Sequence, residues 1–489
     1  MTVGILFVQD DLKDPNRYFE INFEYCHGDH RIRLVFRPCV TGGIGMRVLL
    51  QLRFSPSTHA EATAGTALSR GVSAGLEGAA AGLTLDPSYP PIQLPGVRSV
   101  GGATRMVLGA APEFSSAAQD SSYVVRASIP DGPTQAEVIA SVSAHPDVIG
   151  VFSDPVIEST IVCPGDAAIG SDADVANRLG VTQLQAAGLD GHGVYLAVVD
   201  TGINLVHLKA KGRKTKLSSI KSFTPQGVNS KPGKHPVNHG TMCAFDAGIA
   251  APKATLLDHA LLLSKTPGST VMSGLLSDAV QSYGKLRTIL AAMPATKRAM
   301  VISNSWGMFS PTWDFPPGHP GNYSDNPAHP FNVIVASLET DGADILFAAG
   351  NCGRDCPDGR CSFGTARPIC GANSHPAVIS VAGVDVTKAR VGYSSQGPGR
   401  LSGQKPDLTT YTHFVGSGVY PEDGGTSAAC PVAAGVVAAI RSKYPASRLS
   451  PMQLRTLLFR TAQDRGGLGF DYDYGWGVLD SVALLAALP

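Results

Sequence analysis

Short apolar runs alternate with stretches of helical periodicity through the second half of this chain. Continuous apolar strands that alternate with helices are typical of a parallel sheet covered on both faces. In such a sheet, functional residues gather just past the carboxyl ends of the strands. The predicted strands are VYLAVV (194–199), AMVISNSW (299–306), DILFAAG (344–350) and AVISVAG (377–383), and the predicted helices between them are TVMSGLLSDAVQSYGKL (270–286) and FNVIVASLETDG (331–342).

The first third of the chain has a different pattern. Residues 16–55 alternate between apolar and polar positions, which predicts a small antiparallel β unit. Residues 57–119 are rich in Ala, Gly, Ser and Pro, which predicts a linker with one weak helix at most. YVVRASIP (123–130), TQAEVIASVSAH (134–145) and VIGVFSDPVIES (148–159) then predict a strand, a helix and a second strand.

These patterns divide the chain into four parts. We expect a β-rich segment, an Ala/Gly/Pro-rich linker, a small α/β unit and a large α/β domain. Their bounds are 1–56, 57–119, 120–160 and 165–489.

Composition restricts the partners of the chain. Lys plus Arg and Asp plus Glu both number 39 among 489 residues, so the formal net charge is zero and neither nucleic acid nor an anionic membrane is indicated. The N-terminal sequence MTVGILFVQDDLKDPNRYF lacks a basic n-region, and the longest apolar run, Pro431 to Ile440, is too short to span a bilayer. We therefore expect a soluble, cytoplasmic protein without a membrane partner, and leaderless or late export stays open.

Residues with catalytic chemistry lie at the predicted strand ends. VYLAVV ends in Asp200, DILFAAG ends in Asn351, and His239 opens a small-residue helix between them. Ser427 lies in EDGGTSAACPVAAGV (422–436). Taken singly, an Asp or Asn there is a turn residue, the His is structural and the Ser is a helix N-cap. Together they give a carboxylate, an imidazole and a hydroxyl in the order Asp, His, Ser.

Four sequence blocks make the pattern specific. DTGI (200–203), NHGT (238–241), AAGN (348–351) and GTSAACPVAAG (425–435) resemble the signature blocks of the subtilisin-like serine peptidases. Weaker similarities fill the gaps, and the resemblance covers residues 165–489. It implies an α/β fold, the subtilisin-like three-layer sandwich with a mostly parallel sheet.

The resemblance also implies roles for individual residues. Ser427 would be the nucleophile, His239 its general base, and Asp200 the group that orients the imidazole. Asn351 would donate to the oxyanion. The edge formed by Ser305, Trp306 and Gly307 would pair with an extended protein or peptide substrate, although Trp306 equally suits core packing. The expected activity is that of a serine endopeptidase.

Two other functions fit the sequence less well. A binding protein that kept a peptidase fold would normally lack one of the catalytic groups, and none is missing here. An esterase of the α/β-hydrolase type would need a G-x-S-x-G elbow and the order Ser, Asp, His, which this chain does not offer.

The chain departs from the family at its cysteines. Cys352, Cys356, Cys361 and Cys370 follow Asn351 within nineteen residues, and the alternatives are disulfides, reduced thiols or a metal site. Their spacing is not the paired C-x₂-C of zinc ribbons, so no metal site or cofactor is assigned. Calcium is common in the family, and the sequence leaves it open. Two further thiols, Cys243 and Cys430, stand close in sequence to His239 and Ser427.

The α/β unit at 120–160 resembles the propeptide that precedes such catalytic domains. The resemblance implies a zymogen in which this unit assists folding and inhibits in cis, with self-cleavage between about Glu158 and Ala176. The alternative is a permanent N-terminal domain that is never removed.

Overall fold

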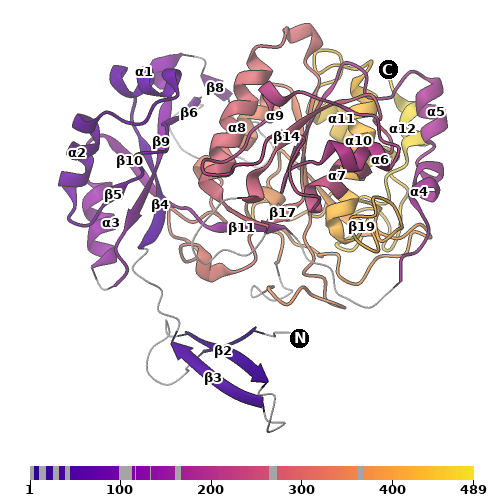
Figure 1. Cartoon of the computed structure of the whole chain (residues 1–489). Coiled ribbons are helices and arrows are strands. Elements are labelled where there is room, and N and C mark those ends of the chain that lie inside the picture. The colour runs from indigo at the N-terminus through magenta and orange to yellow at the C-terminus, as the bar shows by residue number, and fades with distance from the viewer. Residues whose placement is uncertain are drawn as a thin grey trace.

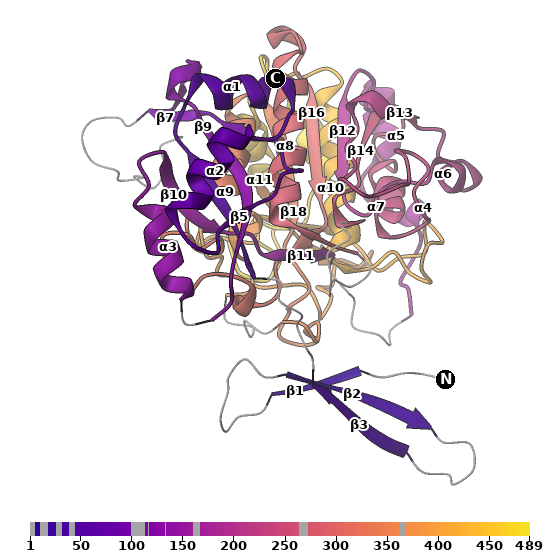
Figure 2. The same cartoon turned by 60° about the vertical axis from the view of Figure 1, so that its left-hand side comes forward.

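The computed structural model describes residues 5–9, 18–25, 32–38, 45–98, 113–115, 117–132, 134–159, 167–263, 272–361 and 367–489. The large α/β domain and a smaller α/β unit lie side by side, and the N-terminal strands form a sheet of their own (Figures 1 and 2).

A seven-stranded parallel sheet forms the centre of the large domain. All of its neighbouring strands pair in parallel, and the strands that sequence analysis predicted lie next to one another in the middle. In spatial order the strands are β13 (Lys216–Leu217), β14 (Thr255–His259), β12 (Tyr195–Val199), β16 (Met300–Asn304), β18 (Ala343–Ala348), β19 (Ile379–Val384) and β20 (Leu408–Tyr411).

Helices cover both faces of this sheet. One hydrophobic cluster joins it to the helices that contribute to one face, and a second cluster joins it to two long helices on the other. The predicted three-layer α/β architecture is thereby confirmed. The first group comprises α4 (Asp172–Arg178), α5 (Val181–Ala186), α6 (Leu205–Ala210), α7 (His239–Ala247), α10 (Gly425–Arg441), α11 (Pro451–Thr461) and α12 (Ser481–Ala487), and the second comprises α8 (Leu276–Ala291) and α9 (Pro330–Thr340).

The smaller unit is an antiparallel sheet with helices on one side. Its strand order is β10, β4, β9, β5, and β6 also pairs with β9. Its elements are β4 (Met46–Leu52), α1 (Pro56–Ala64), α2 (Arg70–Ala79), β5 (Thr84–Leu85), β6 (Ile92–Leu94), β9 (Ser122–Ile129), α3 (Gln135–Ser143) and β10 (Val148–Ser153).

The structure corrects two boundaries in this unit. The predicted linker at 57–119 contains α1, α2, β5 and β6, and the described part of it is therefore mostly ordered structure. β4 lies between β9 and β10, so the unit begins near residue 45 and not at 120. Ser55 caps α1 by accepting the Thr58 N–H at 3.1 Å, and Pro56 follows at the first helical position. Residues 99–112 and 116 of the predicted linker lie outside the described residues.

The predicted strand at 148–159 is two strands in different sheets. β10 stays in the small unit, while β11 (Val156–Ser159) pairs with the large domain. Asp154 and Pro155 separate them, and Pro155 has no N–H to continue a ladder. This break carries the chain from one unit into the other.

Two small sheets complete the described structure. β1 (Ile5–Gln9), β2 (Tyr18–Tyr25) and β3 (Ile32–Pro38) form an antiparallel sheet, as the alternating pattern of the N-terminal segment predicts for its later strands. β7 (Gly96–Arg98) pairs with β8 (Glu113–Ser115).

Candidate active site

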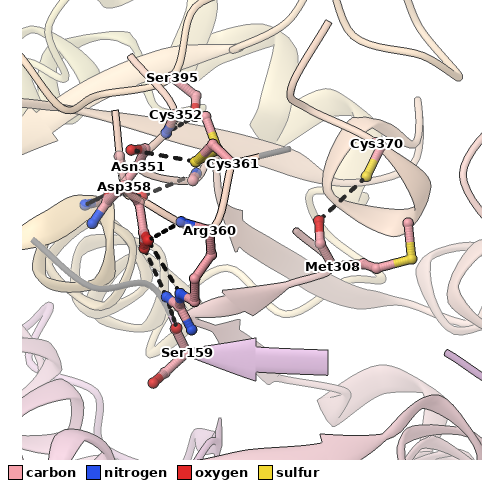
Figure 3. The surroundings of a disulfide bond; sticks show 11 residues. Ser159, Met308, Asn351, Cys352, Asp358, Arg360, Cys361, Cys370 and Ser395 are labelled. Atoms are coloured by element: carbon pink, nitrogen blue, oxygen red, sulfur yellow. Dashed lines mark hydrogen bonds and ion pairs between the residues drawn. A yellow bond between two sulfur atoms is a disulfide. The ribbon is translucent and has the colours of Figure 1, made fainter. Parts of the chain in front are cut away.

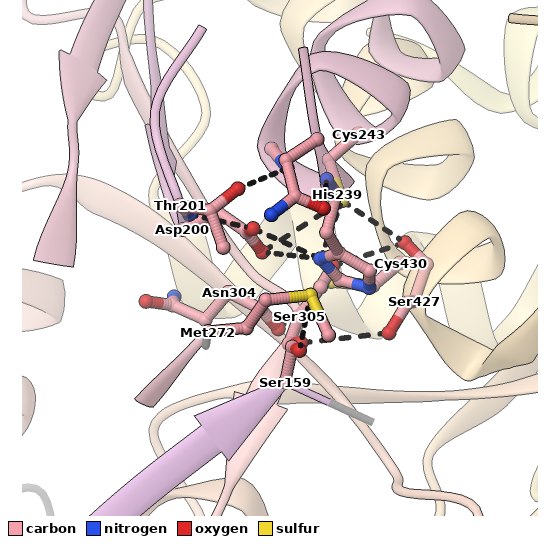
Figure 4. Close-up of polar contacts among 12 residues, drawn as sticks. Ser159, Asp200, Thr201, His239, Cys243, Met272, Asn304, Ser305, Ser427 and Cys430 are labelled. Carbon is pink, nitrogen blue, oxygen red and sulfur yellow. Dashed lines mark hydrogen bonds and ion pairs between the residues drawn. The ribbon is translucent and has the colours of Figure 1, made fainter. Parts of the chain in front are cut away.

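A carboxylate and an imidazole meet at the carboxyl end of β12. Asp200 directly follows this strand, and His239 is the first residue of α7. His239 Nδ1 lies 2.9 Å from Asp200 Oδ1 and 3.0 Å from Oδ2 (Figure 4). The Thr201 N–H donates to Asp200 Oδ1 at 2.7 Å, which holds the carboxylate in place. The carboxylate accepts at Nδ1, so the proton sits there and Nε2 is left as the basic nitrogen.

Ser427 lies in the first turn of α10, next to the same imidazole (Figure 4). The helix starts at Gly425 with Gly424 at the N-cap position and no side-chain capping bond, so the reading of Ser427 as a helix cap is wrong. Its hydroxyl donates to the Ser305 carbonyl at a long 3.4 Å. His239 Nε2 is buried and has no hydrogen-bond partner within the described structure.

Asn351 reaches the same site from the end of β18. It is fully buried, and its Oδ1 accepts the Thr426 N–H at 2.9 Å and the Thr426 hydroxyl at 3.0 Å. These two bonds fix Oδ1 as the acceptor end of the amide, so Nδ2 is the end that carries the N–H donors. The four residues that sequence analysis singled out, Asp200, His239, Asn351 and Ser427, thus come together.

Two thiols also lie in this region, as the sequence suggested. Cys243 Sγ is 3.8 Å from Asp200 Oδ2 and 3.5 Å from the Ser427 carbonyl. Burial, with the nearby Asp200 charge, raises the pKa of Cys243 well above its usual value, and burial raises the pKa of Cys430 to about 12. Both thiols are therefore neutral near pH 7 and are poor nucleophiles.

An extended strand from the N-terminal unit lies along this site. β11 is the middle strand of a three-stranded antiparallel sheet, between β15 (Ser273–Leu275) and β17 (Trp306–Gly307). Glu158 faces Gly307 and Ser159 faces Trp306 in this pairing. Figure 4 shows Ser159 beside the segment that carries Ser305. The chain thus places one of its own extended strands between β15 and β17.

The two readings of Trp306 apply to different parts of the residue. Its backbone pairs with β11, whereas its side chain is fully buried against Phe331 and Phe347. Ser305 turns its hydroxyl to the Ser427 carbonyl at 3.0 Å. The segment 305–307 therefore offers its backbone edge to an extended chain, and the indole packs in the core.

Polar contacts hold the N-terminal unit against α8. Asp154 accepts the Ser277 N–H at 2.7 Å, and Tyr89 donates its hydroxyl to the Ser277 carbonyl at 2.8 Å. Arg126 spans the interface, with Asp86 at 2.7 Å in its own unit and Asp278 at 3.1 Å on the helix. α8 has no side-chain cap of its own, so Asp154 satisfies one of its orphan N–H groups. Burial raises the pKa of Asp154, and Arg126 opposes that shift.

The cysteine-rich loop is closed by a disulfide between Cys352 and Cys361 (Figure 3). Cys356 is also in a disulfide, whereas Cys370 is a buried free thiol whose Sγ lies 3.8 Å from the Met308 carbonyl. The four cysteines are thus in mixed states, and a site in which all four bind one metal ion is not formed.

Arg360 is a residue of the site that sequence reasoning missed. It lies in the disulfide loop and contacts β11 through Glu158 and Ser159. Asp154 was also missed, as was the strand β15. The signal in the sequence was weak, because both side chains act on partners more than a hundred residues away.

The described residues contain one group of three metal-ligating side chains, formed by Asp200, His239 and Cys243. Calcium prefers six to eight oxygen ligands, so this group does not fit it. Within the same described part of the chain, none of the helices has the length and apolar character needed to cross a membrane.

Comparison with known proteins agrees with this geometry. The profile of the subtilase family, Peptidase_S8, matches residues 191–477, which span the strands and helices that carry the candidate site. The chain belongs to the subtilase family. It is therefore a serine-type endopeptidase and acts on protein or peptide substrates.

Individual subtilases match at moderate identity. Subtilisin DY of Bacillus licheniformis is 30% identical over 305 residues, which cover 61% of this chain and 93% of that protein. The calcium-dependent protease of Trichormus variabilis is 29% identical over 61% of this chain and 47% of its own length. Fervidolysin of Fervidobacterium pennivorans is 28% identical over 64% and 43%, so this chain spans less than half of the latter two proteins.

Proposed function

We propose that the chain cleaves peptide bonds with Ser427 as nucleophile, His239 as general base and Asp200 as the group that orients the imidazole. Nε2 of His239 takes the Ser427 proton as the hydroxyl attacks the scissile carbonyl, and it then gives that proton to the leaving amine. The Asp200 carboxylate stabilises the charged imidazole between these steps. The observation that carries this proposal is the buried Asp200–His239 contact of 2.9 Å beside Ser427.

Asn351 serves the oxyanion in this mechanism. The tetrahedral intermediate places a negative oxygen between the Nδ2 donor of Asn351 and the backbone N–H of Ser427 at the start of α10. Ser305, Trp306 and Gly307 present the strand edge that aligns the substrate backbone. No step runs through a metal.

The calcium question raised by the relative from Trichormus variabilis is separate from catalysis. Its name says that it depends on calcium. If this chain also binds calcium, EDTA should lower its thermal stability and added calcium should restore it.

We further propose that the unit of residues 45–159 inhibits the peptidase in cis. β11 fills the position of a substrate, and a tethered segment has an effective concentration in the millimolar range. Burial of Asp154 and the bond to Ser277 support a docked unit. Residues 160–166 of the predicted cleavage window, which runs from Glu158 to Ala176, lie outside the described residues. A permanent domain is the alternative.

One experiment tests the catalytic proposal. Wild-type protein should react with a fluorophosphonate probe at Ser427 and cleave a peptide library, while Ser427→Ala should do neither. Ser447→Ala is a matched control, because Ser447 is exposed and bonds only to the Thr296 carbonyl. Full activity of Ser427→Ala would refute the assignment, and an unreactive wild type would favour the binding-protein alternative.

Intact-mass analysis tests the inhibitory role. Wild-type protein should be cut within the predicted window and gain activity, while Ser427→Ala should stay full length. The isolated 45–159 segment, expressed in trans, should inhibit the cut enzyme if it folds alone. A wild type that is fully active while uncut would support the permanent-domain alternative.

A further inference from the structure

The guanidinium of Arg360 binds β11 (Figure 3). Nη1 donates to Glu158 Oε2 at 2.6 Å, and Nη2 donates to the Ser159 carbonyl at 2.7 Å. The Glu158 side chain is 7% exposed and that of Arg360 is 25% exposed. The contact with Glu158 depends on the side chain at that position. The contact with the Ser159 carbonyl is to the backbone and could be made by any residue at position 159.

Arg360 is held in position from its other side. Asp358 accepts from Nε at 3.1 Å and from Nη2 at 2.7 Å, and the Phe309 ring lies 4.4 Å from Cζ. The Cys352–Cys361 disulfide closes the loop immediately after Arg360. A guanidinium fixed in this way loses little side-chain entropy when it binds a carboxylate.

Nη1 is the nitrogen of the Arg360 guanidinium that Asp358 and the Ser159 carbonyl do not engage, and it suits an acidic partner. Asp358 balances the charge of Arg360, and Nη1 is directed at Glu158. A glutamine at the position of Glu158 keeps a neutral acceptor but loses the charge-assisted bond. A lysine there brings a second cation against the guanidinium in a site that is largely shielded from water.

We propose that Arg360 is a specificity-determining residue that selects an acidic side chain in the substrate at the position facing Gly307. The inference rests on the proposed function, because it requires the substrate to take the place of β11. A hydrogen bond to a charged acceptor is roughly twice as strong as one to a neutral acceptor, so the preference for Glu over Gln should be about tenfold in kcat/KM.

The test uses peptides with the sequence of residues 154–168, with Ser in place of Cys163, and with Glu, Gln, Ala or Lys at position 158. Self-processed enzyme should cleave the Glu peptide about tenfold faster than the Gln peptide and at least tenfold faster again than the Lys peptide. Mass spectrometry confirms that the same bond is cut in each. Equal kcat/KM values for the Glu and Gln peptides would overturn the inference and leave the proposed function intact.

Two variants assign the preference to the side chain. Arg360→Gln should reduce the Glu-to-Gln ratio to within about twofold, mainly through the Glu peptide. Arg354→Gln removes the same charge from an exposed position of the same loop and should keep the wild-type ratio. A wild-type ratio in Arg360→Gln would overturn the inference.

A second readout does not depend on catalysis. In full-length Ser427→Ala, hydrogen exchange of residues 156–159 reports how firmly β11 is bound. Glu158→Gln and Arg360→Gln should each speed exchange, and the double variant should be no faster than the more affected single variant. Additive effects would overturn the inference, even if the chain cleaves no peptide and the proposed function fails.

Discussion

Thr426 donates both its backbone N–H and its hydroxyl to one oxygen, Oδ1 of Asn351, at 2.9 and 3.0 Å. The Thr426 hydroxyl in turn accepts the Gly350 N–H at 3.0 Å. The residue before the candidate nucleophile thus sets the orientation of the candidate oxyanion donor. The buried Thr426 thus links the start of α10, which carries Ser427, to the side chain of Asn351.

This relationship predicts a graded loss of turnover. Removal of the corresponding asparagine donor in subtilisin lowers kcat by about 10²–10³-fold, and we expect that range for Asn351→Ala with little change in KM. Thr426→Val removes one of the two bonds, so kcat should fall about fivefold. Thr409→Val, which loses a buried hydroxyl bonded to the Gly477 carbonyl, is the control and should leave kcat unchanged. A larger loss in Thr426→Val than in Asn351→Ala would contradict this account.

A second prediction concerns the contact between the two helices that carry His239 and Ser427. A Cβ on Gly435 of α10 would lie 2.3 Å from the Ala247 carbonyl at the end of α7. Gly435→Ala should therefore push α7 away, lower the free energy of unfolding by about 1–3 kcal/mol and reduce kcat. Gly75→Ala on α2 meets no atom within 4 Å and should stabilise slightly. Thermal unfolding and steady-state kinetics check both, and a Gly435→Ala enzyme with wild-type kcat would show that the helix contact does not position the site.

The third prediction concerns the thiols. Cys243, Cys370 and Cys430 are buried, and burial raises the pKa of Cys370 and of Cys430 to about 12. Iodoacetamide should leave all three unmodified in native protein and label them in denaturant without reductant, while Cys352 and Cys361 should react only after reduction. Peptide mapping distinguishes these groups. Labelling of Cys352 without reductant would contradict the disulfide.

The disulfide also bears on location. Disulfides persist mainly in oxidising compartments, so this bond argues for the alternative of export. The cytoplasmic location stays a prediction from the N-terminal sequence.

A fourth prediction follows from a buried carboxyl group next to the site. Asp258 Oδ2 accepts the N–H groups of Ile203 and Gly233, and burial raises its pKa to about 7, with a smaller effect from Asp200. His235 Nε2 lies 3.6 Å away, within the distance of an ion pair, yet burial lowers the pKa of His235. Because both shifts favour the uncharged form, this is a contact between neutral groups near pH 6.

The sign of the pH dependence follows from these shifts. Between about pH 4 and pH 7 the unfolded chain releases the Asp258 proton while the folded chain retains it, so this group makes folding less favourable as pH rises. Asp258→Asn removes the effect, and its unfolding free energy relative to wild type should increase across that window and level off above it. Asp131→Asn, an exposed control, should show no such trend. Denaturant unfolding at several pH values measures this, and a difference that does not change with pH would contradict it.

The pattern of apolar residues was sufficient to predict the strands that are buried on both faces of the sheet. The strands ending at Asp200 and Asn351 are continuous apolar runs, and both lie in the middle of the parallel sheet. The prediction of a linker for the Ala-rich stretch was wrong because its helices bury few side chains. In α2, Leu76 is the buried residue. The Ser55–Pro56 start of α1 was a readable signal, since a capping serine followed by proline is typical of a helix N-terminus.

Pairings across long sequence separations could not be predicted. β4 is recognisable as a strand, but nothing in MRVLLQL indicates that its partners are β9 and β10. Arg360 and Glu158 are 202 positions apart, and each reads as a solvent-exposed charge when considered locally. Such contacts depend on how the two units dock, and single-sequence patterns carry no information about that arrangement.

The place of β11 between two other strands has a consequence for the kind of protein that this enzyme attacks. Both edges of β11 are satisfied by hydrogen bonds, one to β15 and one to β17. On the proposal that the substrate replaces β11, it must offer both edges of its own backbone, and a chain segment inside a native sheet or helix has already committed those groups. The free energy of local unfolding is then added to the barrier for cleavage. Frayed termini and disordered loops should be cut first, and a well-folded protein should resist in proportion to the stability of the segment that carries the scissile bond.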